Sequence, residues 1–255
     1  MSKKESYWTK HKQKLKETGE GITFTKQTIL ISDEKKATFE EGKILLIDKP
    51  LHWTSFDVVR KIRNAIRIKK VGHAGTLDPL ATGLLIVCTG KFTKKINEIM
   101  ADEKEYTGSF TLGAVTPTYD LESEPTDLKS FDGLTLEDIK KAIGFFRGDI
   151  MQFPPIYSAI KKDGEALYKL ARRGEEVELK ARPVHIRIFE MTHFDLPVVS
   201  FKVVCSTGTY IRSLAHDVGQ QLGCGAYLNS LRRTRIGNYL VEDAQTIDTF
   251  LQSLV

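Results

Sequence analysis

Residues 71–85, VGHAGTLDPLATGLL, place one carboxylate, that of Asp78, in a stretch with three glycines. The ring of Pro79 disfavours helical backbone angles at Asp78, so we expect this residue on an extended loop. The apolar residues 84–88 predict a short buried strand that fixes the end of the loop. A carboxylate on such a loop can act as a nucleophile or as a base, although an isolated Asp-Pro pair more often marks only a turn.

A second stretch, residues 206–222, offers a cation that needs a partner. Its apolar residues recur at helical spacing and predict a helix that starts near Thr209, the expected N-cap, and ends by Gly223. Arg212 then falls in the first turn, where a cation opposes the helix macrodipole by about 0.3 to 1 kcal/mol. We therefore expect a carboxylate or a phosphate beside Arg212, since a guanidinium can bind either with two parallel hydrogen bonds.

The elements that position these residues follow from apolar patterns and capping residues. Residues 43–48 predict the first core strand, which Pro50 ends, and apolar residues at helical spacing predict an amphipathic helix from Ser55 with Thr54 or Ser55 as its N-cap. Further predicted elements are a helix at 91–100, a strand at 106–112, a helix from the N-cap Thr135 to about Phe146, a helix from about Gly164, and strands at 184–194, 199–205 and 235–241. Residues 114–134 are expected to form a long surface excursion. Runs of helices and strands without βαβ alternation predict an α+β fold.

Composition limits the class of protein. A chain of 255 residues, 41% of them hydrophobic, can form one large domain or two small ones. No apolar stretch approaches the roughly 18 residues of a membrane span, and the N-terminus has no apolar region typical of a signal peptide, so we expect a cytoplasmic protein without membrane contacts. The three cysteines, Cys88, Cys205 and Cys224, are far apart and predict neither a disulfide nor a metal site.

Charge indicates an anionic partner, but weakly. Lys and Arg outnumber Asp and Glu by 38 to 33, a bias that many proteins without a nucleic-acid role share. Residues 1–41 are rich in lysine and predict a basic N-terminal extension, with a possible strand at 28–31. The candidate positions for contacting an anionic partner are Arg60, Lys61, Arg63, Arg67, Lys69, Lys70, Arg232, Arg233 and Arg235. A solvated helix face and a polar strand edge are the alternative interpretations.

The stretch GHAGTLDPLATGLL resembles the signature loop of the TruB-type tRNA pseudouridine synthases, in which the aspartate of GHxGTLDP is catalytic. Three more stretches follow in the order of that family: QFPPIYSAIKKDGEALYKLARRG, CSTGTYIRSLAHDVG and GAYLNSLRRTRIG. The resemblance covers residues 42–241 approximately. It implies the pseudouridine synthase fold, a mixed, mainly antiparallel central sheet flanked by helices with a catalytic cleft. Residues 42–255 would be the catalytic domain, with an RNA-gripping insertion at about 150–176.

The resemblance also assigns roles to single residues. Asp78 would be the catalytic residue and Arg212 the partner of its carboxylate, while His73 resembles a histidine that occupies space in the RNA. The residues implied to contact the target base are Tyr106, which would stack on it, Tyr210, which would line the uridine pocket, and Leu231. Taken alone, each of these aromatic residues is more often part of a core, and a loop histidine more often binds backbone.

The implied reaction isomerises the uridine at position 55 of the tRNA T-loop to pseudouridine. It breaks the N1–C1′ bond, turns the base and forms a C5–C1′ bond without redox change, so no cofactor and no metal are expected. Asp78 would attack C1′ or remove a sugar proton, and the base must first leave its stack. The implied partner is the T-arm of tRNA, and we expect a monomer.

Two departures from the family and two other functions stay open. KPLHWTS carries His52 and Trp53 where the family usually has a glycine, and many bacterial relatives continue into a C-terminal RNA-binding domain, whereas this sequence stops soon after the last predicted strand. The basic N-terminal extension is a possible substitute for that domain. The chain could instead be a tRNA-binding or folding module. An enzyme with a phosphate-bearing cofactor on the loop of Gly72, Gly75 and Gly83 is less favoured, because these spacings match neither a P-loop nor GxGxxG.

Overall fold

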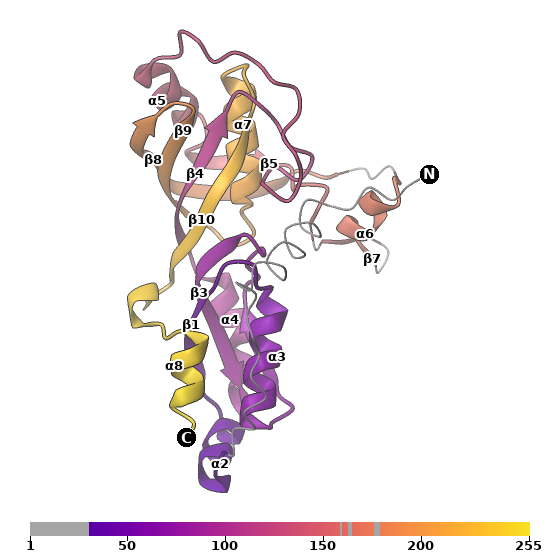
Figure 1. Cartoon of the computed structure of the whole chain (residues 1–255), viewed down its shortest axis with the longest axis vertical. Helices are drawn as coiled ribbons and strands as arrows, with labels where there is room; N and C mark the ends of the chain where they lie inside the picture. Colours follow the sequence, from indigo (N-terminus) through magenta and orange to yellow (C-terminus); the bar gives the residue numbers. More distant parts are fainter. Residues whose placement is uncertain (1–30, 159, 163–164, 176–178) are drawn as a thin grey trace, which may run out of the picture. The chain divides into compact units, whose positions relative to one another are not determined.

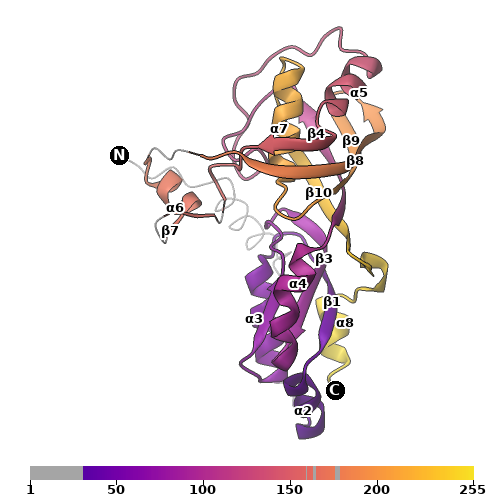
Figure 2. The same ribbon diagram turned by 180° about the vertical axis from the view of Figure 1, so that it is seen from behind.

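The computed structural model describes residues 31–255 except 159, 163–164 and 176–178. The chain forms two compact units, and Figures 1 and 2 label most of their helices and strands. Unit 1 contains residues 108–229, and unit 2 contains the described residues up to 107 together with 230–255. The signature loop therefore belongs to unit 2, and Arg212 belongs to unit 1.

Unit 2 is organised around strand β3 (Ala81–Thr89), which is paired along both of its edges. Its neighbours are β1 (Ile44–Lys49) and β2 (Val71–Ala74), both antiparallel to it, and the end of β10 (Ala226–Ile236), which runs parallel. The other elements of unit 2 are α2 (Asp33–Glu41), α3 (Ser55–Ile66), the 3-10 helix η1 (Gly90–Lys95), α4 (Ile96–Ala101), β11 (Tyr239–Leu240), the 3-10 helix η2 (Val241–Asp243) and α8 (Ile247–Gln252).

Strand β3 is covered by helices on both faces. Leu85 and Val87 belong to one apolar cluster together with α3 and α8, whereas Leu84 and Ile86 belong to a second cluster together with α4. Successive side chains of a strand point to opposite faces, so a strand buried on both reads as a continuous apolar run. This explains why residues 84–88 are uniformly apolar, and it confirms the predicted buried strand.

Helix α3 begins as predicted. Thr54 is the N-cap, and it forms a capping box in which its hydroxyl accepts from the Asp57 amide at 3.0 Å while the Asp57 carboxylate accepts from the Thr54 amide at 3.1 Å. Its buried side chains, which include Val58, Ile62 and Ile66, pack into the cluster shared with β1 and β3. The helix therefore has one face in the core and one face in solvent.

Gly83 lets β10 approach β3 closely. Gly83 pairs with Arg233 and has a φ of +98°. A Cβ at this position would overlap the carbonyl oxygen of Arg233 and would lie 2.8 Å from the backbone nitrogen of Arg233. We expect Gly83→Ala to lower the free energy of unfolding by about 3 kcal/mol or more, because strain and backbone overlap act together. Gly133→Ala is the control, since Gly133 has a φ of +80° but open space around it. Equal urea midpoints of the two variants would contradict the close approach.

Unit 1 contains a sheet with the strand order β10, β4, β9, β8, β5. The pairs β8 with β9 and β5 with β8 are antiparallel. The elements of unit 1 not yet given are β4 (Lys104–Leu112), α5 (Leu136–Gly144), β5 (Gly148–Gln152), β6 (Lys161–Lys162), β7 (Glu165–Ala166), α6 (Leu167–Arg172), β8 (Arg182–Asp195), β9 (Val198–Cys205) and α7 (Ile211–Gln221), with β4 beginning in unit 2. Phe201 packs between Phe110 and Phe189, at ring-centroid distances of 5.9 and 5.8 Å.

Some predicted boundaries are wrong. The last strand was expected at residues 235–241, but β10 starts at Ala226 and the chain turns before β11. The helix expected at 91–100 begins as the 3-10 helix η1 and becomes α-helical only at Ile96. The helix expected from about Gly164 is α6, which starts at Leu167 after the short hairpin of β6 and β7.

The excursion predicted at residues 114–134 is only partly on the surface. Its first part carries buried Ala114, Thr116, Thr118 and Asp120, and only the later part is exposed. The physical reason is that Asp120 and the backbone of Thr118 bind Arg212, so this segment lies against α7. The polar residues that suggested a surface loop are in fact satisfied by buried partners.

Residues 32–41, the end of the predicted N-terminal extension, form a helix with its N-cap in unit 2. Helix α2 starts at the N-cap Ser32, and its Phe39 packs against Phe250 of α8 with ring centroids 6.2 Å apart. The strand suggested for 28–31 lies almost entirely outside the described residues. Among the helices that the structure describes, none has the length and apolar character to cross a membrane.

Candidate active site

Three backbone contacts hold the turn that carries Asp78. This turn, residues 75–80, connects β2 to β3 and closes with the amide of Ala81 donating to the Asp78 carbonyl at 3.0 Å. The Ser55 hydroxyl accepts from the Leu77 amide at 2.9 Å and donates to the Leu77 carbonyl at 3.1 Å. Asp78 itself is half-buried and non-helical, as the proline after it predicted. Hydrogen bonds to the backbone of Leu77 and of Asp78 itself therefore fix the position of Asp78.

His52 forms a hydrogen bond with the C-terminal part of this turn, at Pro79. Its amide donates to the carbonyl of Pro79 at 2.8 Å, and its own φ is +68°. A left-handed conformation costs a residue with a side chain about 1 to 2 kcal/mol, whereas glycine adopts it freely. His52, one of the two residues that depart from the family pattern, therefore has a backbone conformation that glycine adopts more easily.

Arg233 binds the turn from the sheet side. Its side chain is almost fully buried, and it donates from Nε to the Leu84 carbonyl at 2.8 Å and from Nη2 to the Gly75 carbonyl at 3.1 Å. One guanidinium thereby joins the beginning of the turn to the strand that follows it. Sequence reasoning had placed Arg233 among residues for an anionic partner, and this interpretation is wrong because the group is enclosed in unit 2.

The neighbours of Arg233 on β10 also have internal partners. Arg232 binds both carboxylate oxygens of Asp48, at 3.0 and 2.7 Å. Arg235 binds the Glu103 carboxylate at 2.8 Å. These three arginines therefore stabilise unit 2, and the basic patch predicted near the end of the chain is largely neutralised.

Lys49 is a buried cation beside Asp78 that sequence reasoning treated only as the end of a strand. Its Nζ donates to the carbonyls of Trp53 at 2.6 Å, Pro50 at 3.0 Å and Pro79 at 3.5 Å. Burial lowers its pKa to about 8, and the charge of Asp78 acts in the opposite direction. A lysine directly after an apolar strand was the signal in the sequence that could have identified it.

Lys49 should make stability depend on pH in the alkaline range. The unfolded chain keeps this proton up to about pH 10.5, whereas the folded chain releases it near pH 8. The free energy of unfolding should therefore rise with pH between these values, by about 1 to 3 kcal/mol relative to Lys49→Met, in which the group is absent. Urea titrations of both proteins at several pH values test this. Parallel pH profiles of the two proteins would contradict it.

The structure brings Leu231 close to the turn and places His73 on the strand before it. Leu231 is paired in register with Ala81, whose amide binds the Asp78 carbonyl. His73 is part of β2 and half-buried, not in the loop as expected, and burial and the charge of Arg233 lower its pKa. Tyr106 is buried on β4, with 8% of its surface exposed. The roles of these residues toward a base stay predictions.

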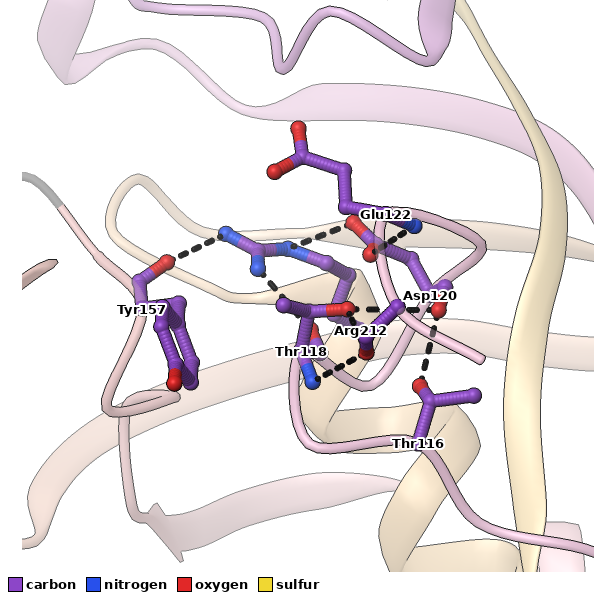
Figure 3. A network of polar contacts seen from close by, with 7 residues as sticks. Thr116, Thr118, Asp120, Glu122, Tyr157 and Arg212 are labelled. Atoms are coloured by element: carbon purple, nitrogen blue, oxygen red, sulfur yellow. Dashed lines mark hydrogen bonds and ion pairs between the residues drawn. The ribbon is translucent and has the colours of Figure 1, made fainter. Parts of the chain in front are cut away.

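In unit 1, Arg212 lies at the centre of a buried polar network (Figure 3). It is the second residue of α7, 5% exposed, and donates to the carbonyls of Thr118 at 3.0 Å and Tyr157 at 3.1 Å. Its Nε lies 3.7 Å from the carboxylate of Asp120, which is also buried. The carboxylate partner that the helix position called for is therefore present within unit 1. The predicted pairing of Arg212 with Asp78 joins residues of different units and stays a prediction.

Asp120 is held as firmly as Arg212, and sequence reasoning missed it. Its carboxylate accepts from the amide of Glu122 at 3.0 Å, and its carbonyl accepts from the hydroxyls of Thr116 at 2.8 Å and Thr118 at 3.3 Å. These contacts fix the position from which the Asp120 carboxylate faces the guanidinium of Arg212. In the sequence, a lone aspartate in a polar segment gave no signal.

Tyr210, not Thr209, is the N-cap of α7. The Thr209 hydroxyl instead donates to the Ser206 carbonyl at 2.9 Å. The buried Gln152 replaces the side-chain cap, because its amide group accepts from the Tyr210 amide at 2.8 Å and donates to the Tyr210 carbonyl at 3.0 Å. The Tyr210 ring lies 4.6 Å from the guanidinium of Arg182. The start of α7, which carries Arg212, is thus fixed by a residue of β5.

Among the described residues, His, Cys, Asp and Glu side chains form no group that could hold a metal ion. The three cysteines are free and buried. The candidate site in unit 2 is the carboxylate of Asp78 with the cation Lys49 beside it, in a turn that hydrogen bonds to the backbone hold in place.

Comparison with known proteins identifies the family. Residues 63–211 match the model of the TruB family pseudouridylate synthase N-terminal domain, and residues 212–255 match the tRNA pseudouridylate synthase B C-terminal domain. The tRNA pseudouridine synthase B of Flavobacterium johnsoniae is 52% identical over 84% of this chain and 96% of its own length, and that of Chloroherpeton thalassium is 45% identical over 88% and 95%. The chain belongs to the TruB family of pseudouridine synthases, as the signature loop predicted.

Solved structures agree with the fold that this family membership implies. A Cbf5-Nop10-Gar1 complex contains a chain 28% identical to this one, with a TM-score of 0.66 over 91% of this chain. The archaeal box H/ACA sRNP Nop10-Cbf5 complex gives 26% identity and a TM-score of 0.63 over 86%. This chain spans 61% and 55% of those two chains. The protein has the pseudouridine synthase fold, with a mixed, mostly antiparallel sheet and flanking helices.

Proposed function

We propose that this protein isomerises the uridine at position 55 in the T-loop of tRNA to pseudouridine, with Asp78 as the catalytic residue. The observation that supports this most strongly is the similarity to tRNA pseudouridine synthases B over almost their full length, 96% for the Flavobacterium johnsoniae protein. The turn with Asp78 lies inside the region that matches. The enzyme is accordingly an isomerase, an intramolecular transferase that forms pseudouridine in tRNA.

Asp78 suits this reaction because its turn is preorganised. Ser55, His52 and Arg233 bind the backbone before and after the carboxylate, so little freedom is left to lose when substrate binds. Lys49 supplies a positive charge nearby without exposing it to solvent. The carboxylate acts on the ribose, either by attack at C1′ or by removal of a sugar proton, while the N1–C1′ bond breaks.

The other proposed roles concern the extruded base. Tyr106 stacks on it, Leu231 contacts it from beside the turn, and Tyr210 lines its pocket. Stacking of this kind offsets part of the few kcal/mol that removing a base from its stack costs. Arg212 pairs with the carboxylate of Asp78, and Asp120 orients the guanidinium through the contacts described above. The base then turns so that C5 faces C1′, and no cofactor takes part.

Tritium release tests the proposal directly. Forming the C5–C1′ bond displaces the hydrogen at C5, so a T-arm hairpin with C5-tritiated uridine should release label into water. A hairpin whose single labelled uridine lies in the stem is the control and should release none. We propose that the active species is a monomer. Light scattering under the assay conditions would show this as the molar mass of a single chain. Tight binding of hairpin and whole tRNA without any release would contradict the proposed activity.

A further inference from the structure

One face of α3 carries an aromatic ring followed by three arginines. Phe56, Arg60, Arg63 and Arg67 are spaced by four, three and four residues, so they form one line along the helix, and we call this line the α3 stripe. The line lies away from Val58, Ile62 and Ile66, which face the core. Phe56 is 57% exposed although it is a large apolar residue.

Most cations of the α3 stripe and of the residues after it lack a carboxylate partner among the described residues. In the part of the chain that the structure describes, Arg63, Arg67, Lys69 and Lys70 form no ion pair, and Arg63 donates only to a carbonyl, that of Val71, at 3.2 Å. Arg60 binds Asp57 at 2.6 Å, and its guanidinium also lies 6.0 Å from the centre of the Phe56 ring. The surface is therefore positively charged next to an exposed ring.

The α3 stripe begins directly beside the turn that carries Asp78. Ser55, the residue before Phe56, makes two hydrogen bonds with Leu77, which precedes Asp78. From Phe56 to Arg67 the helix rises by about 16 Å, which is long enough to follow several phosphates of one strand. A strand that leaves the reacting nucleotide therefore has a continuous surface available within unit 2.

Arg67 occupies a position that would suit glycine. It is the C-cap of α3 and has a φ of +54°, a left-handed conformation in which helices very often end with glycine. An arginine in this left-handed conformation makes the end of the helix less stable than a glycine would. Its exposed charge, which has no ion-pair partner among residues 31–158 and the other described residues, is the compensating feature at the end of the α3 stripe.

We propose that the α3 stripe binds the RNA strand flanking the target uridine, with Phe56 stacked on an unpaired base or its ribose and Arg60, Arg63 and Arg67 on successive phosphates. This inference rests on the proposed function. RNA fits better than a protein partner, because an aromatic ring followed by cations in a line matches alternating bases and phosphates. Neither a general positive patch nor an apolar groove has this order.

Two variants separate the stacking contact from the charge contact. Phe56→Ala should weaken binding of a fluorescent T-arm hairpin about tenfold, with KM raised by a similar factor and kcat changed less than about twofold. Arg67→Gly should weaken binding about threefold and reduce the slope of log affinity against log salt by about 0.7 to 0.9, the value for one phosphate contact. Arg67→Gly should also unfold at the same or a higher urea concentration than the wild type, so weaker binding cannot come from misfolding.

Matched controls exist elsewhere on the chain. Phe145→Ala removes an aromatic ring that is equally exposed, at 57%, and Lys94→Gln removes an exposed cation of unit 2. Both should bind and turn over the hairpin like the wild type. If wild type releases tritium but Phe56→Ala and Arg67→Gly bind like these controls, the α3 stripe is not an RNA surface and the inference is overturned. If wild type binds but releases no tritium, the proposed function fails, while loss of binding in the two variants still supports the α3 stripe.

Discussion

Asp78→Asn should reduce turnover of the T-arm hairpin by at least about 10³-fold while leaving its binding within about twofold of the wild type. Asparagine keeps the shape of the side chain, and the turn is held through backbone contacts of Ser55, His52 and Arg233, none of which involves the Asp78 carboxylate. The substitution therefore removes the proposed catalytic carboxylate while the hydrogen bonds that hold the turn remain.

Single-turnover tritium release with enzyme in excess measures this effect most cleanly, because product release then has no influence. Asp132→Asn is a suitable control, since Asp132 is an exposed aspartate of unit 1 whose carboxylate accepts from the Ser130 hydroxyl. It should react at the rate of the wild type. Retention of more than about a tenth of the wild-type rate by Asp78→Asn would remove Asp78 from the catalytic role.

Asp120→Asn should lower the free energy of unfolding by about 3 to 5 kcal/mol and should also reduce turnover. The side chains of Asp120 and Arg212 are only 5% and 6% exposed, so removing the carboxylate charge weakens the compensation of a buried guanidinium. The guanidinium should then shift, and its hydrogen bonds to the carbonyls of Thr118 and Tyr157 should lose their present geometry. Both the urea midpoint and the tritium-release rate should respond.

The pair of Asp149 and His185 provides the comparison within the same unit. Their contact is short, at 2.8 Å, but Asp149 is 93% exposed, and exposed ion pairs contribute little. Asp149→Asn should therefore leave the urea midpoint unchanged. The double variant Asp120→Asn with Arg212→Gln should lose less stability than the two single losses added together, because the residues act as a unit. Additive losses would show that the two side chains do not depend on each other.

Helices with a capped start were predictable because their signals are local. Thr54 with Asp57, and Thr135 with Asp138, form capping boxes at the starts of α3 and α5. These contacts involve residues three apart, which the sequence displays directly. Strands β1, β8 and β9 were predictable for a similar reason, since their apolar residues and the turns that end them are contiguous.

Strand β10 was misplaced because its composition conflicts with its position. The run from Leu231 to Arg235 is mostly charged or polar, yet it lies in a strand, and Arg233 is almost fully buried there. A buried arginine is stable only with partners for its donors, and those partners are the carbonyls of Gly75 and Leu84. Propensity and periodicity contain no information on such partners.

By itself the sequence determined the family, the turn that carries Asp78 and the elements around it, because these depend on motif order and on contacts between near neighbours. Only the tertiary structure decided which charges neutralise one another. Arg212 reaches a carbonyl 94 residues away, at Thr118, and Lys49 lies beside Asp78 through the pairing of β1 with β3. A charged side chain is locally compatible with solvent, RNA or a buried partner alike, and the free energy that selects among them comes from desolvation and from partners that only the folded chain brings together.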